Sequence, residues 1–357
     1  MMNKQNQNLY DRIQAGQRIS EEDALALFSW DPLTLARAAD LRREQIRPGK
    51  RVGFIIDRII NYTNICRVGC AFCAFCARAD RVPAYEMSRA EIDEKIEELL
   101  PAGGTQVMLQ GGLHPDYDLA VYTGLISHVK ERFPEIWLHA FSPAEVIHVS
   151  EKNGLTPEQV VAEFKAAGLD SLPGASDLLV DRVRRKVSPK KLTVAQWQQV
   201  MAALAENDMK SSATMTYGMG ETPAEKIEHL RVVRETADAT GIIQAFIPWS
   251  FSPANTRLAG QLPATGVDYL TMVAVARVFL DNVPYIQAGW LTEGLRLAQL
   301  ALAWGANDMG GVLTEEVVVR ATGITTTATR EKMIHLVKNA GKTPVQRDSL
   351  YKPLHIY

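Results

Sequence analysis

The sequence predicts an α/β protein built as a (β/α)8 barrel of the TIM type. Three observations support this prediction. Short apolar, β-prone segments alternate with longer helical patterns along most of the 357 residues. Eight such segments suit a parallel sheet, because parallel strands are joined by helical crossovers. The length allows two average domains, but it also suits one barrel of roughly 250 residues with additions at both ends.

The chain before the barrel is predicted to be helical. Ser20 is followed by three acidic residues, and Asp31 is followed directly by Pro32. A capping side chain followed by an acid or a proline is typical of a helix start. We therefore expect helices within residues 8–47 and assign residues 1–50 to an N-terminal helical extension.

The barrel is expected over residues 51–312. Its strands are predicted at 52–60, 105–110, 136–141, 169–173, 211–217, 242–249, 285–290 and 306–310. Its helices are predicted at 88–100, 118–132, 157–167, 193–206, 223–240, 266–281 and 294–303. Ser88 and Glu91 have the spacing of a capping box, and Gly168 resembles a helix stop. In the remaining segment, 313–357, a helix at 329–340 and an extended stretch are expected to cap one end of the barrel.

All four cysteines of the chain lie in one short segment: Cys66, Cys70, Cys73 and Cys76. The first three have the spacing C-x3-C-x2-C. Three thiolates from one loop can bind three irons of a cubane cluster and leave the fourth iron without a protein ligand. An open iron suits the binding and reduction of a small molecule, so the spacing indicates a radical enzyme.

Other uses of these thiols fit less well. The chain opens on polar residues rather than an apolar signal segment, so we expect a cytoplasmic, reducing setting without disulfides. A structural zinc site usually needs two ligand pairs separated by a longer loop. A redox pair of Cys70 and Cys73 leaves two cysteines unexplained. Cys76 is either a spare thiol or a fourth ligand, and a fourth ligand would favour a non-catalytic iron–sulfur or zinc protein.

Composition is that of a globular enzyme, with 46% hydrophobic and 22% charged residues. The net charge of −2 gives no electrostatic reason to expect nucleic acid or an anionic membrane as a partner. No apolar run reaches the ~18–20 residues that a membrane span needs.

Polar groups gather where the predicted strands end. The cysteine loop follows the first strand, which places it at the C-terminal mouth where barrel enzymes carry their chemistry. Other groups at this mouth are Gln110-Gly111-Gly112, His139, Ser142 to Glu145, Glu221 and Asn307-Asp308. Each also has a structural explanation, because paired glycines are common in tight turns and an acid before proline often starts a helix.

The motif C-x3-C-x-F-C after the first strand is similar to the signature of the radical S-adenosylmethionine (SAM) superfamily. The chain also resembles, from about residue 30 to 351, the group that holds the two radical enzymes of the futalosine menaquinone pathway and the deazaflavin (FO) synthase subunits. Within it, the chain is most similar to dehypoxanthine futalosine cyclases. The motifs that resemble the whole group are Asn61-Tyr-Thr-Asn-Ile-Cys66, Gln110-Gly-Gly, Phe141-Ser-Pro-Ala-Glu145 and Phe246-Ile-Pro-Trp-Ser-Phe. Those that point to the cyclases are Gly218-Met-Gly-Glu-Thr222, Phe246-Ile-Pro-Trp249, Ala264-Thr-Gly-Val-Asp-Tyr269, Leu280-Asp-Asn282 and Asn307-Asp-Met-Gly310.

The resemblance implies roles for the cofactor-binding residues. Cys66, Cys70 and Cys73 would bind a [4Fe–4S] cluster, and SAM would chelate its open iron. Phe72 would lie against the adenine. The strand end made by Gln110, Gly111 and Gly112 would contact the methionyl amine through its backbone.

Several candidates are implied for the reaction itself. Glu145 and Asp177 are expected to be polar anchors. Asp177 stands where relatives generally have a longer turn ending in glutamate, and Cys76 stands where they usually have a tyrosine or another residue that is not cysteine. Bases considered for the final proton loss are Glu145, Glu221, His139, Asp281 and Asp308, and Arg277 and Arg296 are candidates for binding a substrate carboxylate.

The implied reaction acts on a small nucleoside-derived substrate. A 5′-deoxyadenosyl radical would remove hydrogen from the ribose C4′ of dehypoxanthine futalosine, and ring closure onto the attached benzoate would follow. A flavodoxin or ferredoxin type of protein would supply the electron. Aminofutalosine synthase and FO synthase activities are alternatives on the same scaffold.

Overall fold

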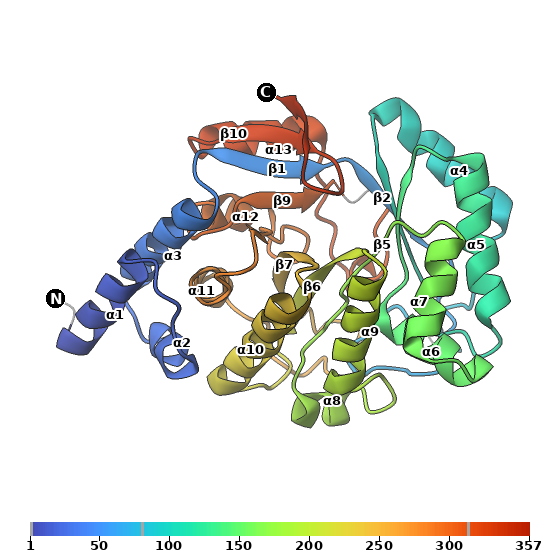
Figure 1. Cartoon of the computed structure of the whole chain (residues 1–357), viewed down its shortest axis with the longest axis horizontal. Coiled ribbons are helices and arrows are strands. Elements are labelled where there is room, and N and C mark those ends of the chain that lie inside the picture. The colour runs from blue at the N-terminus through green and yellow to red at the C-terminus, as the bar shows by residue number, and fades with distance from the viewer. Residues whose placement is uncertain (1–2, 80–81, 313–314) are drawn as a thin grey trace.

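The computed structural model describes residues 3–79, 82–312 and 315–357 (Figure 1). Three helices open the chain: α1 (Lys4–Gln14), α2 (Glu21–Leu27) and α3 (Pro32–Ile46). Both predicted helix starts are confirmed, because Ser20 forms a capping box with Asp23 and the Asp31 carboxylate accepts from the Thr34 N–H at 3.0 Å. The three helices lie at one side of the barrel, where α3 packs against α11 (Gly266–Phe279).

The first predicted strand is present but divided at Ile56 into β1 (Arg51–Ile55) and β2 (Asp57–Asn61). The other seven predicted strands are confirmed, some of them shorter than predicted. They are β3 (Gln106–Gln110), β4 (Trp137–Ala140), β5 (Ser171–Leu172), β6 (Lys210–Tyr217), β7 (Ile243–Ser250), β8 (Tyr285–Ile286) and β9 (Asp308–Gly311). Strands β2 to β8 form one parallel sheet in sequence order.

The ring of strands closes through the divided first strand. Its second half, β2, pairs with β3, and its first half, β1, pairs with β9. A parallel bridge between Gln287 and Asp308 links the end of β8 to β9. The predicted eight-stranded barrel is therefore confirmed, with β1 and β2 together serving as one strand.

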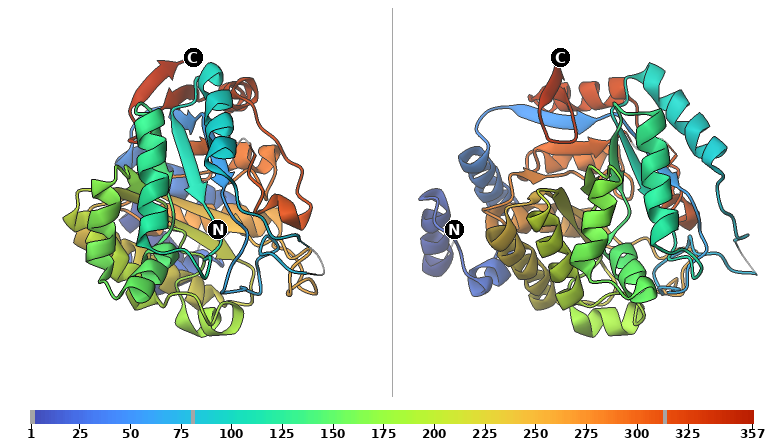
Figure 2. Two further views of the ribbon diagram at one scale, coloured as in Figure 1. Left: turned by 90° about the vertical axis from the view of Figure 1, so that its right-hand side faces the viewer. Right: turned by 45° about the vertical axis from the view of Figure 1, so that its right-hand side comes forward.

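Helices cover the outside of this ring, as both views in Figure 2 show. Besides α11, the predicted helices found are α4 (Arg89–Leu99), α5 (Leu119–Arg132), α7 (Pro157–Ala166), α9 (Val194–Glu206), α10 (Pro223–Thr240) and α12 (Leu295–Ala301), with short 3-10 turns at Leu100–Ala102 and Arg320–Thr322. Helix α9 shows why they form: Trp197, Val200, Met201 and Leu204 are buried at the spacing of one helix face.

Two helices were not predicted. Helix α6 (Pro143–Asn153) starts immediately after the polar end of β4, and α8 (Asp181–Val187) lies between β5 and β6. Ser142 caps α6, and its hydroxyl lies 3.4 Å from the Glu145 N–H. The pattern serine, proline, then glutamate three residues after the serine is itself a helix-start signal.

The C-terminal tail enters the sheet. Helix α13 (Arg330–Asn339) and β10 (Thr343–Arg347) match the predicted helix and extended stretch. Strand β10 pairs in parallel with β1, and β11 (Pro353–Ile356) pairs antiparallel with β10. Since β1 is the start of the first barrel strand, the tail lies at the end of the barrel opposite the cysteine loop (Figure 1). Among the described residues, no helix is long and apolar enough to span a bilayer.

Candidate active site

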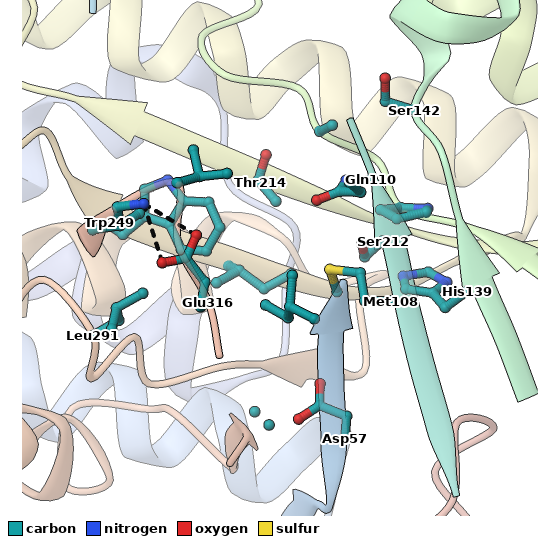
Figure 3. A pocket seen from close by; sticks show the side chains of 18 of the residues that line it. Asp57, Met108, Gln110, His139, Ser142, Ser212, Thr214, Trp249, Leu291 and Glu316 are labelled. Atoms are coloured by element: carbon teal, nitrogen blue, oxygen red, sulfur yellow. Dashed lines mark hydrogen bonds between the residues drawn. The ribbon is translucent and has the colours of Figure 1, made fainter. Parts of the chain in front are cut away.

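A cavity of about 410 Å³ occupies the barrel. Its lining extends from the cysteine loop to Arg347 and Tyr351 of the tail. Barrel interiors are usually filled by large branched side chains. Here the inward positions include Ser171, Ser212 and Gly289, so the centre stays open and partly polar (Figure 3).

The cysteine loop forms one wall of this cavity. Cys66, Cys70 and Cys73 all line it, as does Phe72. The loop is fixed by its backbone, since the Arg67 N–H donates to the Leu113 carbonyl at 3.0 Å and the Ala71 N–H donates to the Val187 carbonyl at 2.7 Å. The structure thus brings together the three predicted cluster ligands and the predicted adenine neighbour.

Gly111 and Gly112 also line the cavity, and the structure gives a packing reason for both. A Cβ on Gly112 would lie 2.3 Å from the Ile65 carbonyl oxygen and 2.9 Å from the Cys66 Cβ. A Cβ on Gly111 would lie 2.6 Å from the Tyr62 ring. These glycines therefore let the cysteine loop approach the end of β3.

The thiols differ in how readily they ionise. Burial raises the pKa of Cys70 to about 12 and also raises the pKa of Cys73. The Cys76 thiol donates to Cys66 and, with nearby backbone N–H groups, lowers the pKa of Cys66 to about 5. Buried thiols that resist ionisation are stabilised as thiolates by a bound cationic centre.

The donor set fits a cubane cluster. Three thiols with the predicted spacing, and Cys76 near them, line a cavity large enough for further groups, and Phe72 and the β3 end line it as well. Among the described residues, no three cysteine, histidine or acidic side chains already meet around a point that would hold a single ion. Thiolates spaced around a multi-iron cluster need no such common point.

Glu145 is buried in the cavity wall. It stands in the first turn of α6, where it accepts hydrogen bonds from the Tyr62 hydroxyl at 2.5 Å and the Ser142 hydroxyl at 2.7 Å. Burial outweighs these bonds and raises the pKa of Glu145 to about 7. The side chain can therefore change its protonation state near neutral pH.

Asp177 lines the cavity and forms an ion pair with Lys191 at 2.5 Å. The Lys191 ammonium also lies 5.9 Å from the centre of the Phe72 ring. Sequence reasoning missed Lys191, because nothing distinguishes it from the other basic residues that follow α8. The pair places one anion and one cation beside the predicted adenine position.

His139 lies deeper, on β4, and its ring nitrogen Nδ1 is 2.7 Å from the Ser171 hydroxyl (Figure 3). Burial, and then the charge of Arg347, lowers the pKa of His139 to about 3. The ring is therefore neutral at physiological pH. It can donate a hydrogen bond to a ligand or accept one from it, but it does not readily take up a proton at this pH.

The structure does not bring Glu221 to the cavity. Its carboxylate accepts from the Gly218 and Met219 N–H groups at 2.7 and 2.8 Å and so fixes the turn after β6. Two other candidate bases are also committed elsewhere. Asp308 binds the Arg347 guanidinium at 2.6 and 2.9 Å, and Asp281 pairs with Arg18.

Neither predicted carboxylate-binding arginine lines the cavity. Arg277 is fully buried and donates to the Gly305 carbonyl and the Asn307 side chain, so it is structural. Arg296 lies in α12, outside the ring of strands. The cationic side chains in the cavity lining are instead Lys191, Lys210 and Arg347.

Glu316 is a cavity carboxylate that sequence reasoning missed. It is buried and lies opposite Thr214 in the close view, near Trp249 and Leu291 (Figure 3). The Val319 N–H donates to it at 3.1 Å, and burial raises its pKa. Its position beyond the last barrel strand gave no sequence signal.

Comparison with known proteins agrees with this geometry. Residues 60–233 match the radical SAM superfamily, and residues 239–357 match the CofH/MqnC C-terminal region. A cyclic dehypoxanthine futalosine synthase of Streptomyces coelicolor is 40% identical over 98% of this chain and 89% of the relative. The same enzyme of Halalkalibacterium halodurans is 39% identical over 98% and 95%. An aminodeoxyfutalosine synthase of Thermus thermophilus is 36% identical over 97% and 95%.

Solved structures show the same fold. Methylornithine synthase superposes with a TM-score of 0.73 at 19% identity, covering 95% of this chain and 97% of the other. The FeFe-hydrogenase maturase HydG of Carboxydothermus hydrogenoformans superposes with a TM-score of 0.76 at 16% identity, covering 97% and 80%. The family models match most of the chain, and the relatives are up to 40% identical over almost its full length. The chain therefore belongs to the radical SAM superfamily, in the CofH/MqnC group, and is an enzyme that uses a [4Fe–4S] cluster and S-adenosylmethionine.

Proposed function

We propose that this enzyme cyclises dehypoxanthine futalosine to cyclic dehypoxanthine futalosine in the futalosine pathway of menaquinone biosynthesis. The observation that carries the proposal is the 40% and 39% identity, over 98% of the chain, to two cyclic dehypoxanthine futalosine synthases. Relatives with other activities are somewhat less similar: a 5-amino-6-(D-ribitylamino)uracil–L-tyrosine 4-hydroxyphenyl transferase of Methanosarcina barkeri is 37% identical, and the aminodeoxyfutalosine synthase is 36% identical. The motifs around Gly218 and Phe246 support the same choice.

The cavity suits a substrate that joins an aromatic acid to a sugar. Its volume of about 410 Å³ lies within the range of roughly 300–1,000 Å³ found for small-molecule sites. Ile247, Trp249 and Leu291 offer apolar surface to an aromatic ring. Ser212 and Thr214 lie in the same cavity and offer hydroxyl groups to a sugar (Figure 3).

We assign cofactor binding to the cysteine-loop end of the cavity. Cys66, Cys70 and Cys73 would hold the cluster, and Phe72 and the β3 end would contact SAM. When bound, these cofactors supply the radical chemistry that removes a hydrogen atom from an unactivated carbon. The protein determines which hydrogen is taken, because reacting atoms held about 3–3.5 Å apart react in preference to all others.

Polar side chains near the cofactor end would fix the reactants. Lys191 offers a cation to a carboxylate, and Asp177 holds that cation in place while keeping further acceptor capacity for a hydroxyl. Glu145, with a pKa of about 7, suits a group that takes up or returns a proton at neutral pH. Its two hydroxyl donors keep the carboxylate oriented.

The closed ring of strands and the tail would keep water away from the reaction. Arg347 and Tyr351 lie at the tail end of the cavity, where the Arg347 guanidinium stacks 3.8 Å from the Tyr351 ring centre. Exclusion of water protects reactive intermediates from side reactions. The proposal also includes a cytoplasmic location and an outside protein of the flavodoxin or ferredoxin type as electron donor.

A product assay tests the proposal. The reconstituted, reduced enzyme is incubated with SAM and dehypoxanthine futalosine, and the products are separated and weighed by mass spectrometry. We expect free 5′-deoxyadenosine and a product lighter than the substrate by two hydrogen atoms. Turnover of an enol ether substrate into a product that retains the adenosyl group would assign the chain to the aminodeoxyfutalosine synthases instead.

A further inference from the structure

The surface beside the cysteine loop carries basic side chains that take no part in the cavity. We propose that Arg185, Lys186, Lys190 and Arg257, together called the basic face, dock an acidic one-electron carrier protein that reduces the cluster. This inference rests on the proposed function in one respect: such an enzyme needs an electron from outside. It adds where on this chain the electron enters.

The basic face is attached directly to the cysteine loop. The carbonyl of Val187, at the end of α8, accepts from the Ala71 N–H at 2.7 Å. On the other flank, the Arg257 N–H donates to the Ala71 carbonyl at 3.0 Å, and the Arg257 guanidinium donates to the Gly69 carbonyl. A protein docked here therefore contacts segments that are bonded to the loop between Cys66 and Cys73.

The charges of the basic face are available to a partner. Arg185, Lys186 and Lys190 are exposed, and among the described residues no acidic side chain pairs with them. Neighbouring cations are already used. Arg182 pairs with Glu225, and Lys191 pairs with Asp177.

Two acids on the adjoining segments have other partners. Asp181 accepts from the Val194 N–H, and Glu151 pairs with Arg67 on the far flank of the loop. The whole chain has a net charge of −2, so the positive charge of the basic face is local and does not reflect an excess of basic residues in the protein. A local positive surface attracts an acidic partner and speeds its encounter, and salt weakens both effects.

Helix α8, which carries part of the basic face, is held in place by buried hydrogen bonds. Arg184 is buried, and its guanidinium donates to the carbonyls of Ser176, Leu178 and Leu192. These bonds hold α8 to the cavity wall beside Asp177. A partner that binds α8 would therefore sit at a fixed distance from the thiols, which repeated electron transfer requires.

The carrier is the occupant that this position favours. Electron-transfer complexes are small and transient, so a few charges suffice to form one. The step moves one electron from the reduced carrier to the oxidised cluster; the carrier loses one electron, the cluster gains one, and no bond forms or breaks. A nucleic acid could use the same charges, but the loop contacts give it no reason to bind at this place.

The test uses a double charge reversal, Lys186→Glu with Lys190→Glu, in the cluster-loaded enzyme. The matched control is Lys332→Glu with Lys338→Glu on α13, because both lysines are exposed and α13 belongs to the tail at the other end of the barrel. Two quantities are measured: the affinity for purified flavodoxin by calorimetry at low and high salt, and the rate of turnover. Turnover is driven either by flavodoxin hydroquinone or by dithionite, which needs no docking.

We expect the double reversal on the basic face to lower both flavodoxin affinity and flavodoxin-driven turnover at least tenfold, with dithionite-driven turnover unchanged. The control should match the wild type in both, and salt should weaken wild-type binding. Unchanged flavodoxin affinity in the reversed variant would overturn the inference, as would an oligonucleotide binding there while flavodoxin does not. Absence of cyclised product with dithionite would refute the proposed function alone, because flavodoxin binding still tests the docking.

Discussion

Among the four cysteines, three are the predicted cluster ligands, and the fourth, Cys76, lies outside their spacing. Cys66, Cys70 and Cys73 occupy the superfamily spacing, and all three face the cavity. Cys76 also lines the cavity, but its thiol donates to backbone carbonyls, at 3.6 Å to that of Cys66 and at 3.7 Å to that of Ala77. We expect a thiol bonded to the backbone beside a ligand to tune the site and not to complete it.

Alanine substitutions test this division. Cys66→Ala, Cys70→Ala or Cys73→Ala should each remove most of the bound iron and abolish SAM cleavage, because each removes one of three protein ligands. Cys76→Ala should keep both. Iron and sulfide content, visible absorbance and 5′-deoxyadenosine release measure the outcome. Loss of the cluster in Cys76→Ala would show that the fourth thiol is a ligand after all.

Glu145 gives a prediction about pH. Its pKa in the folded protein is about 7 against an ordinary 4.5, so the folded state binds the proton more tightly than the unfolded state. Its contribution to stability is therefore complete below pH 4.5 and is lost as the pH rises through 7. The difference corresponds to roughly 3 kcal/mol.

The comparison is made with Glu145→Gln, which cannot titrate. On cluster-free protein, the free energy of unfolding of the wild type relative to this variant should fall by roughly 3 kcal/mol between pH 4 and pH 8. Urea unfolding at several pH values measures it. Parallel pH profiles for the two proteins would contradict a buried, titrating carboxylate at this position.

At the residue scale, the predicted side chains that the structure places in the cavity lining are those whose chemistry comes with a motif. The cysteines carry their spacing, and Glu145 follows a marked strand end. Lys191 and Glu316 could not be foretold, because their roles depend on where loops fold back over the cavity. Glu221 lies outside the cavity lining for a physical reason: an acid next to a glycine turn can accept from the turn's own N–H groups, and here it does.

Among the structural elements, the contact between the β3 end and the cysteine loop gives the sharpest prediction. Gly112→Ala places a methyl group 2.3 Å from the Ile65 carbonyl oxygen, so the loop must move. We expect a cost of about 1–3 kcal/mol in stability, as for other overpacked sites, and at least a tenfold loss of bound iron. Iron content after reconstitution is the direct readout.

The matched control for this change is Gly260→Ala, whose added methyl group would meet nothing within 4 Å. It should leave iron content and stability as in the wild type. If Gly112→Ala also retains a full cluster, the close approach of the two segments does not position the thiols.

Helices were predicted well where a local sequence signal marks the start of the helix. Ser88 with Glu91, and Thr222 with Glu225, start helices that the sequence placed within one residue. Helix α8 was missed because it has seven residues and no side-chain cap. Helix α6 was not predicted although Ser142 to Glu145 carries a helix-start signal, because the same residues also form the polar end of a predicted strand.

For the whole molecule, the tail and the barrel are joined by a buried ion pair. Arg347 of β10 binds Asp308 of β9, and Asp308 has no exposed surface. Removal of one partner leaves the other charge buried without compensation, which typically costs 3–5 kcal/mol. Arg347→Met should therefore lower the free energy of unfolding by about that amount, as measured by urea denaturation.

Arg231→Met is the control for this pair. Arg231 pairs with Glu235 one helical turn away on the surface, and such exposed pairs contribute about 0–1 kcal/mol. If both variants lose equally little stability, the buried pair does not fasten the tail to the barrel.

At the same scale, the alternation of strands and helices was enough to predict the barrel, since few other topologies accept eight parallel strands. The position of the C-terminal tail was harder to predict from the sequence. Strand β10 pairs with β1 across nearly the whole chain, and no local pattern reports so distant a partner. The first strand divides at Ile56: before it, β1 pairs with β9 and β10, and after it, β2 pairs with β3.

The most direct test of the cyclase assignment follows one hydrogen atom. Dehypoxanthine futalosine carrying deuterium at the ribose C4′ is turned over by the reduced enzyme with SAM, and the 5′-deoxyadenosine is analysed by mass spectrometry. We expect one deuterium in the released 5′-deoxyadenosine and none at that carbon in the cyclised product. Unlabelled 5′-deoxyadenosine alongside the cyclised product would contradict it.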